Sequence, residues 1–137
     1  MEQISQGNTH EHEFSFTQEE VKLFAKVTGD SNPLHLDSEY AANTPFKKPI
    51  MHGILSASIF SKVLGTIFPG EGTVYLSQKV DFLRPMFVEV KYKAVFEVKS
   101  INPDKHTAVI STSIYQIDTN KITVRGEAGV MHRELIG

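Results

Sequence analysis

The feature that most constrains the fold is an apolar segment, residues 53–68, with the spacing of a helix but almost no polar face. Between Gly53 and Gly70 only Lys62 carries a charge. A helix that is apolar on most sides lies inside a protein or crosses a membrane. The segment is short for a bilayer, and three serines, Lys62 and Gly65 interrupt it. We therefore expect a buried central helix and no membrane insertion.

Small residues repeat every four positions along the same segment, at Gly53, Ala57, Ser61 and Gly65. Such a stripe lets another surface approach closely, and we expect that surface to be a sheet. The first turn has a second property, because its unpaired N–H groups lie at the positive end of the helix dipole. These donors suit a developing oxyanion, and Gly53 permits close approach by a substrate.

After Gly72 the apolar pattern changes to period two, which is typical of half-buried antiparallel strands. Strands are predicted over 74–82, 88–98, 107–117 and 122–132, and a shorter one over 12–16. Turn residues separate the last three at 102–105 and 118–121. A chain of 137 residues fits one domain. The predicted fold is α+β: a single domain over 1–137, with a curved antiparallel sheet wrapped around a long central helix.

Composition excludes several classes of protein. No cysteine is present, so disulfides, zinc–thiolate sites and cysteine nucleophiles are excluded. The net charge of −2 gives no broad reason to bind nucleic acid. The first residues have neither a basic region nor an apolar core, unlike a signal peptide. We expect a cytoplasmic protein without nucleic-acid partners.

A helix predicted over 17–28 delivers the chain to its most polar motif. Thr17 and Glu20 form a capping box, and Gly29 is a suitable residue just past the helix end. Asp30 comes directly after Gly29, and His35 lies five residues further along the chain. Pro33 between them opposes continuation of the helix. On a stiff loop a carboxylate and an imidazole can converge on one target as an acid/base pair. An ordinary turn rich in Asp, Ser, Asn and Pro is the alternative.

In combination these motifs resemble one family. Asp30-Ser31-Asn32-Pro33-Leu34-His35-Leu36-Asp37, followed by Phe46, Pro49-Ile50-Met51-His52-Gly53 and Ser58, is similar to the MaoC-type (R)-specific enoyl-CoA hydratases of the hotdog fold. The resemblance covers nearly the whole chain. It implies that Asp30 and His35 are the catalytic dyad and that the Gly53 N–H is the oxyanion donor. Relatives often have Gly-Asp in the turn after the Arg-Pro region, where this chain has residues 87–90, Phe-Val-Glu-Val.

The resemblance implies a hydro-lyase that adds water to trans-2-enoyl-CoA and forms (R)-3-hydroxyacyl-CoA. It implies a homodimer, with acyl-CoA tunnels near the subunit interface. We expect no metal and no cofactor, since coenzyme A is part of the substrate. Beside the dyad and Gly53, we expect six residues to bind or orient the substrate: Asn32, His52, Ser58, Lys47, Lys48 and Arg84.

Several of these six residues also have a structural interpretation. Asn32 could orient a side chain or cap the loop, and Ser58 could bond to the motif loop or to a backbone carbonyl. His52 is expected to fix the loop and not to act as a base. Lys47 and Lys48 lie in a segment, 38–49, expected to be a loop, where they suit either solvent or phosphate groups.

Three other functions stay open at this point. Dehydration of 3-hydroxyacyl chains on acyl carrier protein uses the same dyad in reverse. Thioester hydrolysis would release a free thiol, and an inactive module would bind acyl-CoA without turnover. The preferred acyl length, the carrier, the pathway and the separate roles of Asp30 and His35 are not determined by the sequence.

Overall fold

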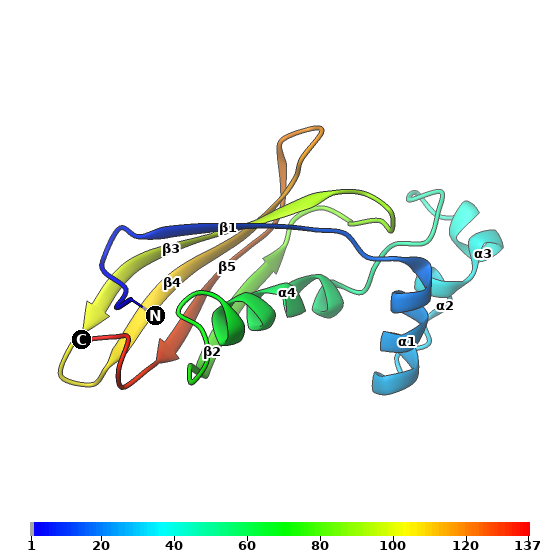
Figure 1. Ribbon diagram of the computed structural model, residues 1–137. Coiled ribbons are helices and arrows are strands. Elements are labelled where there is room, and N and C mark those ends of the chain that lie inside the picture. The colour runs from blue at the N-terminus through cyan, green and yellow to red at the C-terminus, as the bar shows by residue number, and fades with distance from the viewer. Residues whose placement is uncertain (1) are drawn as a thin grey trace.

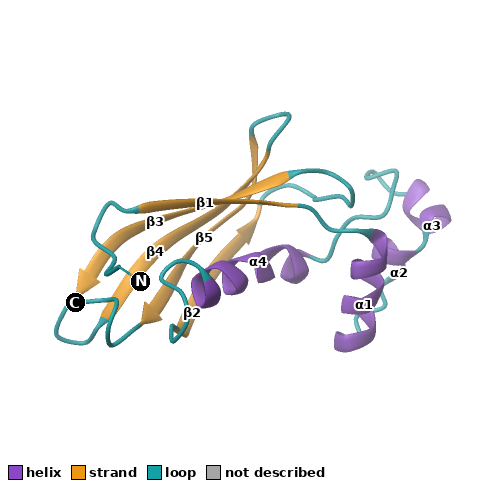
Figure 2. Ribbon diagram, in the orientation of Figure 1, coloured by secondary structure: helices purple, strands orange, loops and turns teal. Residues whose placement is uncertain are grey.

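A computed structural model describes residues 2–137 and shows one antiparallel sheet curved around one long helix (Figures 1 and 2). The strands are β1 (Thr9–Phe14), β2 (Val74–Phe82), β3 (Tyr92–Asn102), β4 (Thr107–Gln116) and β5 (Lys121–Met131). Their order in the sheet is β1-β3-β4-β5-β2. The predicted α+β arrangement is confirmed. The pairing of β2 with β5, which begins at Val74 opposite Met131, could not be derived from periodicity.

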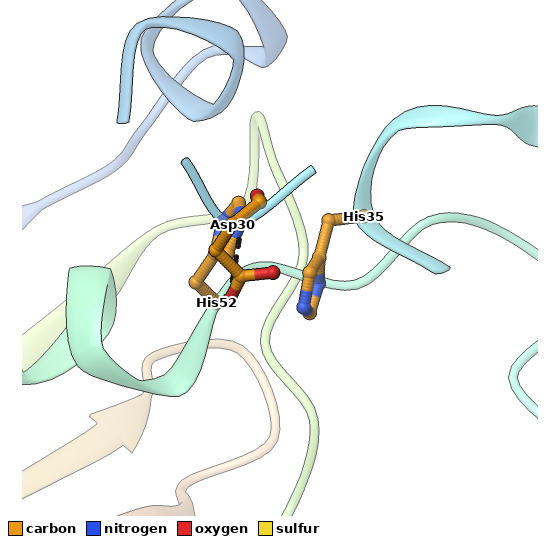
Figure 3. Close-up of side chains that lie close together, drawn as sticks. All are labelled: Asp30, His35 and His52. Carbon is orange, nitrogen blue, oxygen red and sulfur yellow. Dashed lines mark hydrogen bonds and ion pairs between the residues drawn. The ribbon is translucent and has the colours of Figure 1, made fainter. Parts of the chain in front are cut away.

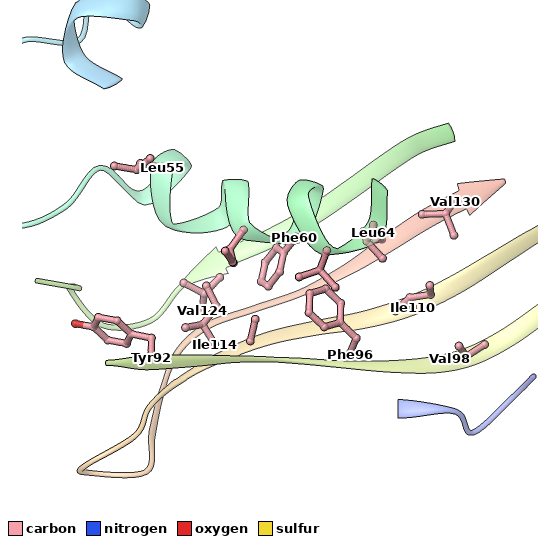
Figure 4. Close-up of a cluster of buried hydrophobic side chains, with 14 of the residues drawn as sticks. Leu55, Phe60, Leu64, Tyr92, Phe96, Val98, Ile110, Ile114, Val124 and Val130 are labelled. Carbon is pink, nitrogen blue, oxygen red and sulfur yellow. The ribbon is translucent and has the colours of Figure 1, made fainter. Parts of the chain in front are cut away.

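Helix α4 (Gly53–Thr66) lies across the inner face of the sheet, as its apolar sequence predicts (Figure 4). Its buried face includes Phe60, Val63 and Leu64, which belong to one cluster with Phe96 and Ile110 of the sheet. Burying a side chain of this size contributes about 1.5–3 kcal/mol. This packing holds the first turn of α4 in a fixed place.

The small-residue stripe of α4 packs on the sheet only in part. Gly53 lies against Phe82 of β2, and Ala57 packs against the core cluster, whereas the other two positions face away from the sheet. Ser61 is exposed, and a Cβ added to Gly65 would meet no other atom within 4 Å. The larger side chains take the sheet-facing side because they bury more apolar area. Ser61 and Gly65 are left on the outer side of the helix.

Three shorter helices lie beyond the end of the sheet: α1 (Gln18–Thr28), α2 (Pro33–Leu36) and α3 (Ser38–Ala42) (Figure 1). The capping box of Thr17 and Glu20 and the left-handed Gly29 are confirmed for α1. Residues 38–49 are not entirely a loop, because Asp37 caps α3 through the N–H groups of Glu39 and Tyr40. None of the helices described is long and apolar enough to cross a membrane.

Strands β1 and β3 differ from the prediction by more than one residue at both ends, and β3 extends to Asn102. Strand β1 lies over 9–14 instead of 12–16, since the chain turns away after Phe14 toward α1. Strand β3 begins at Tyr92 and not at residue 88, because Glu89 adopts a left-handed φ of 59° in a tight turn.

Candidate active site

Asp30 is positioned by the end of α1. Gly29 takes a φ of 81°, which reverses the chain at little cost for glycine. The Asp30 N–H then donates to Thr28 Oγ1 at 3.2 Å, and Asp30 Oδ1 accepts the Asn32 N–H at 3.3 Å. These short-range bonds set the shape of the turn, and they leave the Asp30 side chain 53% exposed.

His35 is carried by the one-turn helix α2, not by the stiff loop that Pro33 was expected to produce. Pro33 occupies the first helical position, where its missing N–H costs nothing. Asn32 caps this helix, because its Oδ1 accepts the Leu34 N–H at 3.0 Å. Of the two roles open to Asn32, the structure therefore shows capping.

A hydrogen bond to the backbone fixes the ring of His35. Its Nδ1 lies 2.7 Å from the carbonyl oxygen of Ile50, so Nδ1 carries the proton and donates it. In the neutral ring the lone pair is then on Nε2, which is free to accept a proton. Asp30, His35 and His52 each offer an atom to one cluster whose members all lie within 4.8 Å of one another (Figure 3). A single water with two hydrogen bonds of about 2.8 Å can bridge such a gap.

His52 lies against both groups and is only 2% exposed. Its Nε2 donates to the backbone carbonyl of Asp30 at 3.0 Å, and its ring centroid is 3.9 Å from that of His35. Two imidazoles and a carboxylate could in principle hold a metal ion. That use would require a lone pair on His52 Nε2, which instead carries the donated proton. The hydrogen bonding therefore favours an acid/base site over a metal site.

A cavity of about 430 Å³ opens beside His35, between the first turn of α4 and the chain that follows β2. His35 and Gly53 both contribute to its wall. Among the lining residues Met51, Ser56, Met86 and Val124 are buried, whereas Phe46, Ile54 and Phe82 are exposed. The wall is mainly apolar, as expected of a site for an alkyl chain. The remaining residues that line the cavity are Ile50, Leu83, Arg84 and Pro85.

Gly53 is the first residue of α4, and no side-chain hydrogen bond caps this end of the helix within the described chain. The donors of the first turn are therefore not taken by a cap. The ring of Phe82 lies directly over Gly53. A Cβ at this position would come within 2.8–3.0 Å of three ring carbons. Only glycine lets Phe82 and the helix start approach so closely.

The residues outside the motif that were expected to bind the substrate do not all lie at the cavity. Ser58 Oγ donates to the Leu55 carbonyl at 2.5 Å, so the backbone alternative is the one observed and the bond to the motif loop is not. Arg84 does line the cavity, and its guanidinium donates to the Ile122 carbonyl at 2.6 Å.

The two lysines lie in the exposed segment after α3. Lys48 Nζ is 4.4 Å from the centre of the Phe87 ring, and Lys47 has a left-handed φ of 69°. Neither lines the cavity. Their contact with a phosphate group stays a prediction.

Sequence reasoning missed Phe82. Its place in the alternating pattern assigns it to the core face of β2, yet it is 49% exposed and lines the cavity. The only sequence signal is its position at the end of a strand, just before Arg84-Pro85.

A sheet wrapped around one helix, with a carboxylate and an imidazole beside an apolar cavity at that helix's first turn, defines a hotdog-fold protein with an acid/base site. The chain belongs to the MaoC-like family, since the MaoC like domain model matches residues 2–120. It is 44% identical to an (R)-specific enoyl-CoA hydratase from Aeromonas caviae over 111 residues, 81% of this chain and 82% of that protein. 

Two further similarities are to a protein of known structure and to an enzyme named for acyl carrier protein. The solved structure of an (R)-hydratase from A. caviae involved in PHA biosynthesis matches with a TM-score of 0.90 and 40% identity, over 94% of this chain and 97% of that one. A mitochondrial 3-hydroxyacyl-(acyl-carrier-protein) dehydratase from Arabidopsis thaliana is 30% identical over 115 residues, 82% of this chain and 68% of that protein.

Proposed function

We propose that the protein hydrates trans-2-enoyl-CoA to (R)-3-hydroxyacyl-CoA. The observation that carries this proposal is the proximity of the Asp30 carboxylate and the His35 imidazole beside a cavity lined by His35 and Gly53. The stereochemistry and the CoA carrier follow the names of the relatives in Aeromonas caviae.

The geometry supports a mechanism with one bridging water. The water oxygen attacks Cβ of the enoyl thioester while His35 Nε2 takes one of its protons. The Asp30 carboxylate accepts a hydrogen bond from the other and stabilises the imidazolium that forms. The electrons of the double bond move onto the thioester oxygen, where the Gly53 N–H stabilises the enolate. The proton on His35 then returns to Cα. These groups supply the proton transfers without a cofactor.

The test is the hydration of crotonyl-CoA, followed by the loss of enoyl absorbance, with chiral analysis of the product. Each proton-transfer group contributes about 10²–10⁴-fold. We therefore expect Asp30→Asn and His35→Gln each to lower kcat by at least about 100-fold while the fold is kept. Near-wild-type turnover in either variant would remove that residue from the mechanism.

Acyl carrier protein is the second candidate carrier, because the relative from Arabidopsis thaliana is named for it. The dyad is equally suited to the reverse dehydration. Comparing kcat/KM for the same acyl chain on the two carriers decides between them. A thiol reagent in the same assay reports hydrolysis, and binding with no turnover on either carrier would indicate an inactive module.

A homodimer through strand β2 is part of the proposal. β2 is an edge strand of the sheet, and Val74, Leu76 and Phe82 on it are exposed apolar residues. An exposed apolar edge favours pairing with another strand. The second copy would continue the sheet and cover Ile54, Ser61 and Gly65 on the outer side of α4.

A further inference from the structure

We infer that His52 is a positioning residue that holds both members of the catalytic dyad in place; this inference rests on the function proposed above. His52 Nε2 lies 3.0 Å from the carbonyl oxygen of Asp30 and 4.0 Å from its Oδ2. The ring of His52 also lies against the ring of His35, with centroids 3.9 Å apart and an interplanar angle of 32°. Figure 3 shows the three side chains together.

Asp30 needs such a contact because its other hydrogen bonds are local. Its N–H bonds to Thr28 and its Oδ1 to Asn32, both within two residues of it. They fix the turn internally but do not attach it to α4. The bond from His52 joins Asp30 to a residue 22 positions further along the chain. Since His52 immediately precedes Gly53, this bond also ties the backbone of Asp30 to the start of α4.

His35 is held by the same residue in a different way. The bond from His35 Nδ1 to Ile50 fixes one edge of the ring, and the ring of His52 lies against its face. His52 in turn is backed by Phe24 of α1, with ring centroids 4.8 Å apart. The aromatic contacts restrict the ring of His35 and keep Nε2 directed at one point.

The tautomer of His52 separates positioning from proton transfer. Nε2 carries the proton that is donated to Asp30, and Nδ1 is buried without a hydrogen-bond partner among the described residues. His52 is 2% exposed and does not line the cavity. It therefore acts on the reaction through Asp30 and His35 and not by contact with the substrate.

Two substitutions separate the hydrogen bond of His52 from its ring contacts. His52→Phe keeps a flat ring beside His35 and Phe24 but removes the donor, and His52→Gln keeps an N–H donor but removes the ring. Because displacement by about 1 Å can cost about 100-fold in rate, we expect His52→Phe to lower kcat about 10–100-fold with KM changed less than about threefold. His52→Gln recovers part of this loss.

The deciding measurement is a double-mutant cycle with Asp30→Asn. If His52 acts through Asp30, His52→Phe lowers the residual activity of the Asp30→Asn variant by less than about threefold, since effects of groups that act as a unit are non-additive. His132→Phe is the matched control. His132 is also buried, and its Nε2 bonds to the Glu71 carbonyl at 2.8 Å far from the dyad. We expect it to lower Tm and leave the kcat of folded protein unchanged.

The outcomes distinguish this inference from the function it rests on. A folded His52→Phe variant with wild-type kcat, or an equal loss in both backgrounds, would overturn the positioning role while hydratase activity stands. A wild-type protein without turnover would overturn the proposed function instead. If His52→Phe does not fold by circular dichroism, the cycle is run with His52→Gln, which removes the ring contact with His35. A loss of kcat that is smaller in the Asp30→Asn background supports the inference, and wild-type kcat or an equal loss in both backgrounds refutes it.

Discussion

The contact between Gly53 and Phe82 allows a quantitative test of how the site is built. In Gly53→Ala the new Cβ would lie 2.8–3.0 Å from three carbons of the Phe82 ring. Ordinary carbon contacts are about 3.5–4.0 Å, so the ring must move by about 0.5–1.2 Å. The side chain of Phe82 is half exposed and can swing at a cost of about 0.5–1.5 kcal/mol. Alanine in a helix stabilises the folded protein by about 1 kcal/mol relative to glycine.

The cost of moving the Phe82 ring and the gain from alanine in the helix nearly cancel in the free energy of unfolding. The displaced ring, however, still changes the shape of the site. We therefore expect Gly53→Ala to change Tm by only a few degrees and to lower kcat/KM for crotonyl-CoA about 10–100-fold, because a displacement near 1 Å is costly for a reaction. The backbone N–H of residue 53 is kept, so the loss reports on space and not on a missing donor.

The matched variant is Gly53→Ala with Phe82→Ala, measured beside Phe82→Ala alone in the same hydration assay. Removing the ring relieves the contact, and the double variant should recover at least about tenfold over Gly53→Ala. Wild-type activity in Gly53→Ala, or a double variant no better than Gly53→Ala, would refute the close packing of Phe82 on the helix start.

Three further predictions concern the pH dependence, the edge strand and the sheet. Burial raises the pKa of Tyr75 to about 12 from 10.0, so between these pH values unfolding releases the phenol proton. The free energy of unfolding, measured by denaturant titration, should therefore fall as the pH rises from about 10 to about 12. The fall should be smaller in Tyr75→Phe. Leu76→Lys places a charge on the exposed edge of β2 and should convert dimers to monomers in sedimentation analysis, whereas an unchanged mass would exclude this edge. A Cβ at Gly126 would collide with the backbone oxygen of Lys79, while one at Gly65 meets nothing within 4 Å. Gly126→Ala should therefore lower the free energy of unfolding by about 3 kcal/mol or more, and Gly65→Ala should raise it by about 1 kcal/mol. Equal effects of the two substitutions would argue against the packing described.

The parts of the fold that follow from local chemistry could be predicted from the sequence. The capping box at Thr17, the end of α1 at Gly29 and the start of α4 at Gly53 each depend on neighbouring residues alone. Helices α2 and α3 were not predicted, because each is about one turn long and is set by a single capping side chain, Asn32 or Asp37. Such elements produce no periodicity.

The site was predicted in its chemical groups but not in its connections. The spacing of Asp30 and His35 predicted a possible acid/base pair, and the helix start predicted donors at Gly53; the structure places both His35 and Gly53 on the wall of one cavity. The contact of His52 with Asp30 and the contact of Phe82 with Gly53 join segments far apart in the chain. Such contacts depend on how the sheet closes around α4, which is a property of the whole fold.

The placement of α1, α2 and α3 beyond the end of the sheet has a consequence for how the molecule opens (Figure 2). Proteins open locally in cooperative units, and units with little buried apolar contact open at the lowest free energy. The strands β3, β4 and β5 share the buried cluster with α4, whereas α2 has no buried residue and α3 has only Ala41. Backbone amides of α2 and α3 should therefore exchange with deuterium well before those of the central strands. His35 lies on α2, whereas Gly53 begins the helix that packs on the central strands, so we expect a brief opening of α2 to move His35 away from Gly53 without unfolding the sheet.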